Sequence, residues 1–169
     1  MFTTAKIYVA DLAAYNSGIL HGIWIENLLD LTDVEEQITV MLSKSPIEGA
    51  EEYAIHDYEG FGNIAIGEFF SIERVHSIAF FLFQNDEYGS LILSYCNEDI
   101  DEAQRMLNDC FLGQYDSVED YAQAMLEDSI ELPANLAYYF DWERYARDLE
   151  MNGDIQTIEC GNGVLIFSH

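Results

Sequence analysis

The sequence predicts an α+β fold, with sheets toward both ends of the chain and a helix-rich middle. Three observations lead to this prediction: strand-like runs separated by turn residues near the start, apolar residues at helical spacing through the middle, and a hairpin pattern at the end. The chain has 169 residues, of which 50% are hydrophobic, so it can bury a substantial core.

The first third predicts two strands, a helix and a third strand. Apolar runs cover residues 6–9 and 19–25, and a turn sequence at residues 16–18 separates them. A helix is expected from Asp33 to about Ser43, since Thr32 stands three residues before Glu35 at the spacing of a capping box. Residues 51–62 alternate as a strand would, and the glycines that follow suggest a domain boundary near residue 62.

The middle of the chain predicts helices. Ser71 can cap a helix whose apolar positions run to Leu82. Residues 91–95 fit either a strand or a buried helix, because periodicity does not separate the two. Residues 97–131 predict two amphipathic helices with carboxylates on their outer faces, joined by a short β-compatible segment at 110–115.

The last third predicts helices followed by a hairpin. Residues 134–140 suggest a short helix, and Asp141 is placed to cap a longer one that Gly153 ends. Residues 155–160 and 164–167 flank Gly161-Asn162-Gly163, a turn sequence typical of β-hairpins.

Charge is the dominant feature of the composition. The chain has 32 acidic and 6 basic residues, a formal net charge of -26 that opposes direct binding to nucleic acid or anionic membranes. In duplex DNA, 26 charges correspond to about 44 Å of helix axis, so the charge suffices for imitation of DNA. No signal peptide or membrane-length apolar run is visible, and three cysteines lack CxxC spacing, which together predict a cytoplasmic protein.

The sequence lacks recognisable motifs for catalysis and for metal or nucleotide binding. The four histidines are scattered, and carboxylate pairs must occur by chance among so many acids. Residues 97–102 begin like an EF-hand loop, but Glu102 and Asn108 stand where glycine and the bidentate glutamate are needed. Walker A, GxGxxG and GxSxG patterns do not occur. We therefore expect neither an enzyme nor a bound cofactor or metal.

Three separated segments resemble one known family. They are IYVADLAAYNSGILHGIWIE near the start, EEYAIHDYEGF in the first third and FDWERYARDLEMNGD near the end, and together they resemble the ArdA antirestriction proteins. The resemblance implies a DNA mimic, carried on mobile genetic elements, that occupies the DNA-binding channel formed by the methyltransferase core of type I restriction-modification enzymes. It also implies an elongated homodimer with three small domains per subunit, here residues 1–62 (N-terminal α+β), 63–104 (central helical) and 105–169 (C-terminal α+β).

Under this hypothesis, ordered surface carboxylates stand in for DNA phosphates. The candidates are Asp30, Asp33, Glu35, Glu36, Glu98, Asp99, Asp101, Glu102, Asp109, Asp116, Glu119, Asp120, Glu127, Asp128, Glu131, Asp141, Glu143, Asp148, Glu150 and Asp154. The densest aromatic cluster predicts a dimer contact at Tyr138, Tyr139, Phe140 and Trp142.

Two other functions compete with DNA mimicry. An acidic adaptor or chaperone would bind a basic protein through one compact patch without DNA-like geometry. A hydrolase hidden among the carboxylates would need a deep pocket and a carboxylate whose pKa is strongly raised.

Overall fold

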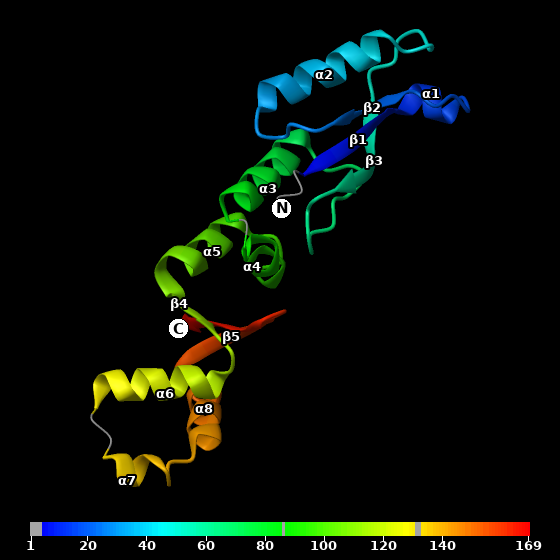
Figure 1. Cartoon of the computed structure of the whole chain (residues 1–169). Helices are drawn as coiled ribbons and strands as arrows, with labels where there is room; N and C mark the ends of the chain where they lie inside the picture. Colours follow the sequence, from blue (N-terminus) through cyan, green and yellow to red (C-terminus); the bar gives the residue numbers. More distant parts are fainter. Residues whose placement is uncertain (1–4, 86, 131–132) are drawn as a thin grey trace. The chain divides into compact units, whose positions relative to one another are not determined.

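The computed structural model describes residues 5–85, 87–130 and 133–169. The chain forms two compact units, residues 1–100 and 101–169, each with its own three-stranded antiparallel sheet (Figure 1). The N-terminal unit contains β1 (Lys6–Asp11), α1 (Leu12–Asn16), β2 (Gly22–Ile25), α2 (Leu31–Ser43), β3 (Tyr53–Glu59), α3 (Ile72–Gln84) and α4 (Gly89–Tyr95). Helix α5 (Ile100–Arg105) begins at the last residue of the N-terminal unit and continues into the C-terminal unit. The C-terminal unit further contains a π-helical turn (Met106–Cys110), β4 (Phe111–Tyr115), α6 (Val118–Ser129), α7 (Ala134–Ala137), α8 (Trp142–Met151), β5 (Ile155–Cys160) and β6 (Gly163–Ser168).

The first strand is central in the sheet of the N-terminal unit, where the order is β2-β1-β3. Ile7 of β1 lies opposite Ile25 of β2 and Tyr58 of β3. The inward-facing side chains of β1 are fully buried, and α2 contributes the buried residues Val34, Ile38 and Met41. A period of about 3.6 on α2 and of 2 on β1 therefore brings apolar residues to one side of each element.

The turn from β1 into α1 contains a buried carboxylate. Asp11 is fully buried, and its Oδ1 atom accepts hydrogen bonds from the amides of Ala13 (2.9 Å) and Ala14 (3.2 Å). Asp11 thus caps α1, satisfying two amides that have no partner within the helix.

Two helices complete the N-terminal unit. Ser71 caps α3 by accepting a hydrogen bond from the Arg74 amide, and α3 buries Val75 and Ile78. The α4 segment, which periodicity alone left open between strand and helix, is a helix that buries Ile92 and Leu93.

In the sheet of the C-terminal unit the last strand is central, and the order is β4-β6-β5. The β5–β6 hairpin pairs Cys160 with Gly163 across the predicted turn. Gly163 has φ +127, and a β-carbon there would collide with the Tyr115 carbonyl oxygen of β4. Glycine is required at this position by both the backbone conformation and the available space.

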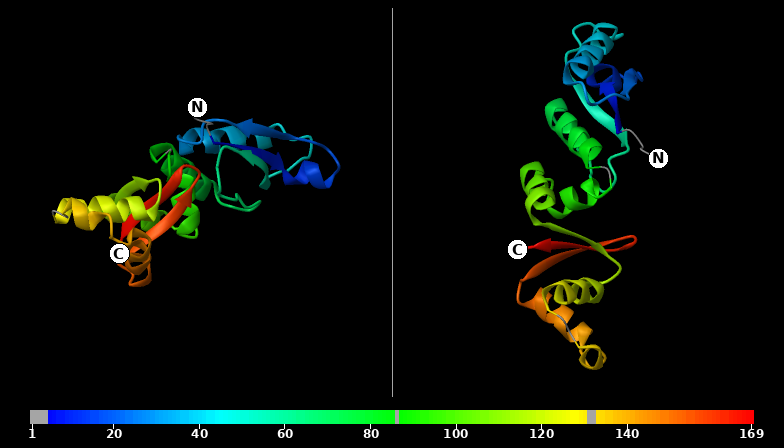
Figure 2. Two further views of the ribbon diagram at one scale, coloured as in Figure 1. Left: turned by 60° about the horizontal axis from the view of Figure 1, so that its bottom comes forward. Right: turned by 60° about the vertical axis from the view of Figure 1, so that its left-hand side comes forward.

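One apolar cluster fixes the two acidic helices of this unit. Helices α6 and α8 pack against each other and against the sheet (Figure 2). The cluster consists of Tyr121, Ala122, Ala146, Leu149, Ile155, Val164 and Ile166. Because the inward stripes of both helices enter this core, their charged faces are directed away from it.

Most predicted elements are confirmed, including α+β composition with a sheet toward each end, the cap at Ser71, the cap at Asp141 and the C-terminal hairpin. The predicted start of α2 is wrong, because the helix begins at Leu31 and Asp30 accepts the hydrogen bond from the Asp33 amide. The second strand begins at Gly22, three residues later than the start of the apolar run. The division into three domains and the elongated form stay predictions.

Among the described residues, no helix has the length and apolar character needed to cross a bilayer.

Candidate partner-binding surface

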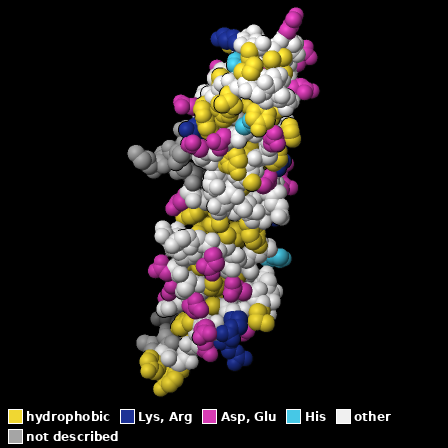
Figure 3. Space-filling view, turned by 90° about the vertical axis from the view of Figure 1, so that its right-hand side faces the viewer, with side chains coloured by type: hydrophobic (Ala, Val, Ile, Leu, Met, Phe, Trp, Pro, Cys, Tyr) yellow, Lys and Arg dark blue, Asp and Glu magenta, His cyan; other side chains and the backbone are white. Residues whose placement is uncertain are grey.

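The predicted carboxylates are largely at the surface. On the face that Figure 3 displays, acidic side chains are spread over both units and basic ones are few. The candidates on the described residues are exposed, except Glu98, Glu102 and Glu119, which are half-buried. Glu131 lies outside the described residues. An exposed carboxylate can still be bound by hydrogen-bond donors of the same chain.

Some candidates hold the ends of helices. Asp30 caps α2, and Asp141 caps α8 by accepting a 3.0 Å hydrogen bond from the Arg144 amide. Asp120 accepts a 2.7 Å hydrogen bond from the hydroxyl of Ser117, which itself caps α6. The negative charge of such caps also stabilises the positive end of the helix dipole.

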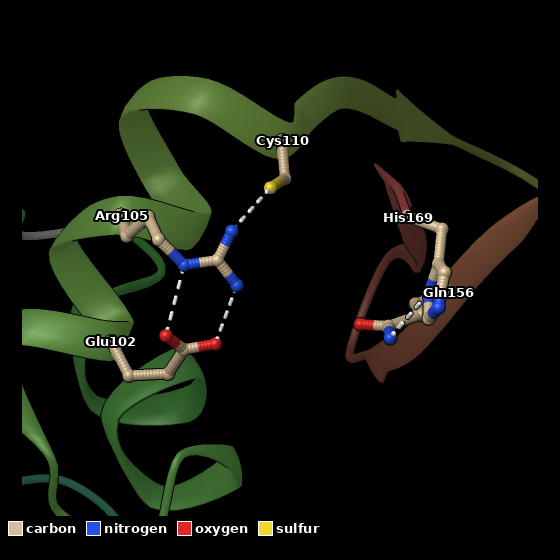
Figure 4. A network of polar contacts seen from close by, with 5 residues as sticks. All are labelled: Glu102, Arg105, Cys110, Gln156 and His169. Atoms are coloured by element: carbon tan, nitrogen blue, oxygen red, sulfur yellow. Dashed lines mark hydrogen bonds and ion pairs between the residues drawn. The ribbon is translucent and has the colours of Figure 1, made fainter.

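Other candidates are paired with arginines. Glu98 binds Arg74 (3.0 Å) and Glu143 binds Arg147 (2.8 Å). The third pair is bidentate: Arg105 donates through Nε (2.9 Å) and Nη2 (2.7 Å) to the two oxygens of Glu102 (Figure 4). The same guanidinium reaches Cys110 Sγ at 3.5 Å, and thus links α5 to the end of the π-helical turn. Bidentate pairs of this kind are geometrically specific.

Three further candidate carboxylates accept hydrogen bonds from side-chain amides or hydroxyls. Gln37 donates to Asp33, Gln123 to Glu127 and Thr157 to Glu150. We call the carboxylates with these intramolecular partners the engaged set: Asp30, Asp33, Glu98, Glu102, Asp120, Glu127, Asp141, Glu143 and Glu150. Asp99 is also in contact with other residues.

The remaining candidates accept no side-chain hydrogen bond and form no ion pair within the described ranges. This unengaged set is Glu35, Glu36, Asp101, Asp109, Asp116, Glu119, Asp128, Asp148 and Asp154. Their negative charge is offset by no bound donor, so they are the better candidates for contacts with another molecule.

Carboxylates outside the predicted set are exposed as well. Sequence reasoning missed them because they lie in strands and loops or, for Glu73, at the start of helix α3, instead of on the acidic helices. They include Glu26, Glu48, Glu51, Glu52, Asp57, Glu68, Glu73, Glu87 and Glu159. In strand β3 the signal was present, since Asp57 and Glu59 interrupt the apolar run of that strand.

The pKa shifts of three carboxylates are all downward. The hydrogen bond from Arg105 lowers the pKa of Glu102, and hydrogen bonds from its own amide and from Ser71 lower that of Glu73. Burial alone would raise the pKa of Asp11, but hydrogen bonds from Ser45, Ala14 and Ala13 and the charge of His21 outweigh it and lower that pKa. These groups remain ionised at neutral pH, whereas a hydrolase would need a carboxylate whose pKa is raised.

The histidines within the chain have structural contacts. His21 Nε2 lies 2.8 Å from the Met41 carbonyl oxygen, and His76 Nδ1 lies 2.7 Å from that of Leu28. His56 packs edge-on against Tyr15 and lies 3.8 Å from Glu68. No group of three or more His, Cys, Asp or Glu side chains in the described parts of the chain is arranged to hold a metal ion.

A hollow of about 460 Å³ lies on the surface of α8. It is lined by Asp141, Glu143, Arg144, Arg147, Asp148 and Met151. Two carboxylates of this lining belong to the engaged set, and both arginines come from the same helix. The lining brings together no nucleophile with a neighbouring base, so the hollow offers charge and no arrangement for acyl or phosphoryl transfer.

The predicted dimer residues divide into two groups. Phe140 packs on Trp142 and Tyr145, with ring centroids 4.3 and 5.5 Å apart, and so covers the start of α8. Tyr138 and Tyr139 are 87% and 81% exposed, which leaves their rings available to another molecule.

Comparison with protein families identifies the chain. The family model described as "Antirestriction protein (ArdA)" matches residues 7–163. The chain belongs to the ArdA family of antirestriction proteins. The match spans both units, so the family relationship applies to the N-terminal sheet and the acidic C-terminal helices of this ArdA protein alike. A comparison with curated proteins finds no match.

Proposed function

We propose that this ArdA protein inhibits type I restriction-modification enzymes by occupying the DNA-binding channel of their methyltransferase core as a DNA mimic. The family match over residues 7–163 carries the proposal. A net charge of -26 and an unengaged set of carboxylates within the two folded units support it. Lysines and arginines that normally hold phosphates would bind these carboxylates, and the released counterions would favour the complex.

The mechanism is competition for a surface, without a bond made or broken. Each contact between a carboxylate and a basic side chain is charge-assisted, and exposed contacts of this kind are individually weak. Single Asp or Glu substitutions in the unengaged set should therefore have small effects on inhibition, whereas clusters of substitutions should have large ones. One substitution such as Asp128→Asn that abolished inhibition in a folded protein would contradict this distributed mechanism.

The proposal is tested by displacement of labelled duplex DNA from a purified type I methyltransferase. Fluorescence anisotropy should fall as the protein is added. The inhibition constant of the protein, calculated with the DNA affinity measured at each salt concentration, should rise as NaCl goes from about 50 to about 200 mM. Formation of a ternary complex without loss of DNA would favour the adaptor function. An absence of any interaction at low salt would overturn both.

We also propose a homodimer with the exposed pair Tyr138 and Tyr139 at its contact. Aromatic residues are enriched at interface centres, and these two rings are almost fully exposed in the single chain. The double variant Tyr138→Ser, Tyr139→Ser should sediment as a monomer where the unaltered protein sediments as a dimer. Phe140→Leu, which alters a ring packed on α8, is the matched control and should not change the oligomeric state. A double variant that still sediments as a dimer would exclude this contact.

A further inference from the structure

Two adjacent residues in the left-handed region lie at the end of the N-terminal unit. Asn97 has φ 53 and Glu98 has φ 64, and among the described residues they are the only non-glycine residues with positive φ. The unit ends two residues later, at Ile100. Asparagine tolerates this conformation better than most residues, but a glutamate there is strained. Strain that persists in a folded chain needs a compensating interaction.

The strained residues terminate α4. The Glu98 amide donates to the Leu93 carbonyl (2.8 Å), and the Asn97 amide donates to that of Ser94 (3.1 Å). This is the hydrogen-bond pattern of a Schellman motif, in which glycine is the usual residue in the left-handed position. In this motif the left-handed position belongs to Asn97, the residue after the helix cap, and Glu98 follows it as a second left-handed residue at the end of α4.

An ion pair secures Glu98 in this conformation. Its Oε2 atom lies 3.0 Å from Arg74 Nη2, 24 residues away at the start of α3. Arg74 is itself anchored, since its guanidinium lies 4.9 Å from the ring centroid of Phe70 and its amide donates to Ser71 Oγ. The pair therefore joins the first turn of α3 to the turn that follows α4.

We propose that the Arg74–Glu98 ion pair is a latch that holds the strained turn after α4, and that Glu98 is a positioning residue instead of a carboxylate that contacts the target. The latch fixes the backbone conformation of the turn at the C-terminal end of α4. Because the ion pair is partly exposed, with side-chain exposures of 46% and 28%, salt and competing charges weaken it.

Amide hydrogen exchange at residue 98 tests the latch without reference to inhibition. Arg74→Gln and Glu98→Gln should each accelerate exchange of this amide about fivefold, because the strained turn opens more often. Glu98→Gly removes the same charge as Glu98→Gln but adopts positive φ without strain, so its exchange should stay within about twofold of the unaltered protein. Arg147→Gln, which breaks an exposed ion pair inside one helix, is the control and should leave residue 98 unaffected.

Two results of the exchange experiment would overturn the proposal. Equal exchange in Arg74→Gln and the unaltered protein would show that the ion pair does not hold the turn. Equal acceleration in Glu98→Gly and Glu98→Gln would show that the strain is not what the pair opposes.

The role of Glu98 in inhibition rests on the proposed function and needs a separate measurement. If Glu98 positions the chain, Arg74→Gln and Glu98→Gln should both raise the concentration for half-inhibition, by about two- to threefold, and Glu98→Gly should not. If Glu98 instead contacts the target, Arg74→Gln should lower that concentration by freeing the carboxylate, and this would overturn the positioning role. Failure of all variants and the unaltered protein to inhibit would reject the proposed function, while the exchange result would still decide on the latch.

Discussion

The N-terminal unit buries a carboxylate, Asp11, whereas the core cluster of the C-terminal unit contains only apolar side chains and one tyrosine. Both units nevertheless use a three-stranded antiparallel sheet with helices packed against it. Both units depend on apolar packing, but the first also buries an ionised group, while the second depends on the geometry of one hairpin. Each unit contains one of the two tryptophans, Trp24 and Trp142, so the fluorescence of single-tryptophan variants reports on each unit separately.

The largest effect is expected in the C-terminal unit from Gly163→Val. The new side chain would collide with the Tyr115 carbonyl oxygen and would adopt positive φ, which together should cost about 3 kcal/mol or more. Urea unfolding followed by Trp142 fluorescence measures the loss. Gly161→Ala in the same turn has no atom within 4 Å of the added carbon and is the matched control, with an expected change below about 0.5 kcal/mol. Equal losses in both variants would refute this account of the hairpin.

The next largest effect is expected in the N-terminal unit from Asp11→Ala. The substitution leaves the amides of Ala13 and Ala14 without their acceptor in a buried turn and should lower the free energy of unfolding by about 2 kcal/mol. Trp24 fluorescence should record an earlier transition, and Trp142 fluorescence should not. Glu36→Ala, which removes an exposed and unengaged carboxylate, should leave both transitions in place. A shift confined to Trp142 would contradict the assignment of Asp11 to one unit.

The same carboxylate should make the N-terminal unit the more sensitive to acid. The pKa of Asp11 is lower in the folded protein than its ordinary value of 3.8, so its ionised form stabilises the fold above about pH 4. This stabilisation is lost as the pH falls from about 4 through the folded pKa. The stability difference between the unaltered protein and Asp11→Asn, followed by Trp24 fluorescence, should therefore shrink below pH 4. A difference that stays constant from pH 6 to pH 3 would contradict this linkage.

A smaller effect is expected from the exposed cap of α8. Asp141→Ala removes the acceptor for the Arg144 amide and should cost about 1 kcal/mol in the Trp142 transition. Asp148→Ala on the same helix removes an unengaged carboxylate and should cost less than about 0.5 kcal/mol. If Asp148→Ala were as destabilising as Asp141→Ala, the distinction between engaged and unengaged carboxylates would have no structural meaning.

Local chemistry explains which parts of the fold sequence reasoning could predict. The caps at Ser71 and Asp141 and the hairpin at Gly161-Asn162-Gly163 depend on neighbouring residues and are readable from them. The start of α2 differs from the prediction because Asp30 and Thr32 are both residue types that cap helices, and in the structure Asp30 accepts the hydrogen bond from the Asp33 amide.

The candidate site was predictable only as a set of exposed acids on helix faces. Sequence spacing does not show that Arg74 reaches Glu98 across 24 residues or that Thr157 donates to Glu150, because these contacts arise from tertiary packing. By contrast, the pairs of Arg105 with Glu102 and of Arg147 with Glu143 lie at helical spacings and could have been read from the sequence. The structure thus separates carboxylates that serve the fold from those available to a partner.

The central claim is that the unengaged carboxylates stand in for DNA phosphates. Its most direct test compares two variants with four substitutions each and the same change in net charge. One neutralises the unengaged Glu36, Asp116, Asp128 and Asp148, and the other neutralises the engaged Asp33, Glu127, Glu143 and Glu150, each as the corresponding amide. Binding to a type I methyltransferase is measured across a salt series. The unengaged variant should bind about tenfold more weakly and with a flatter dependence on salt, and the engaged variant should lose less. Affinity and salt dependence unchanged from the unaltered protein in the unengaged variant would contradict the claim that these carboxylates stand in for phosphates.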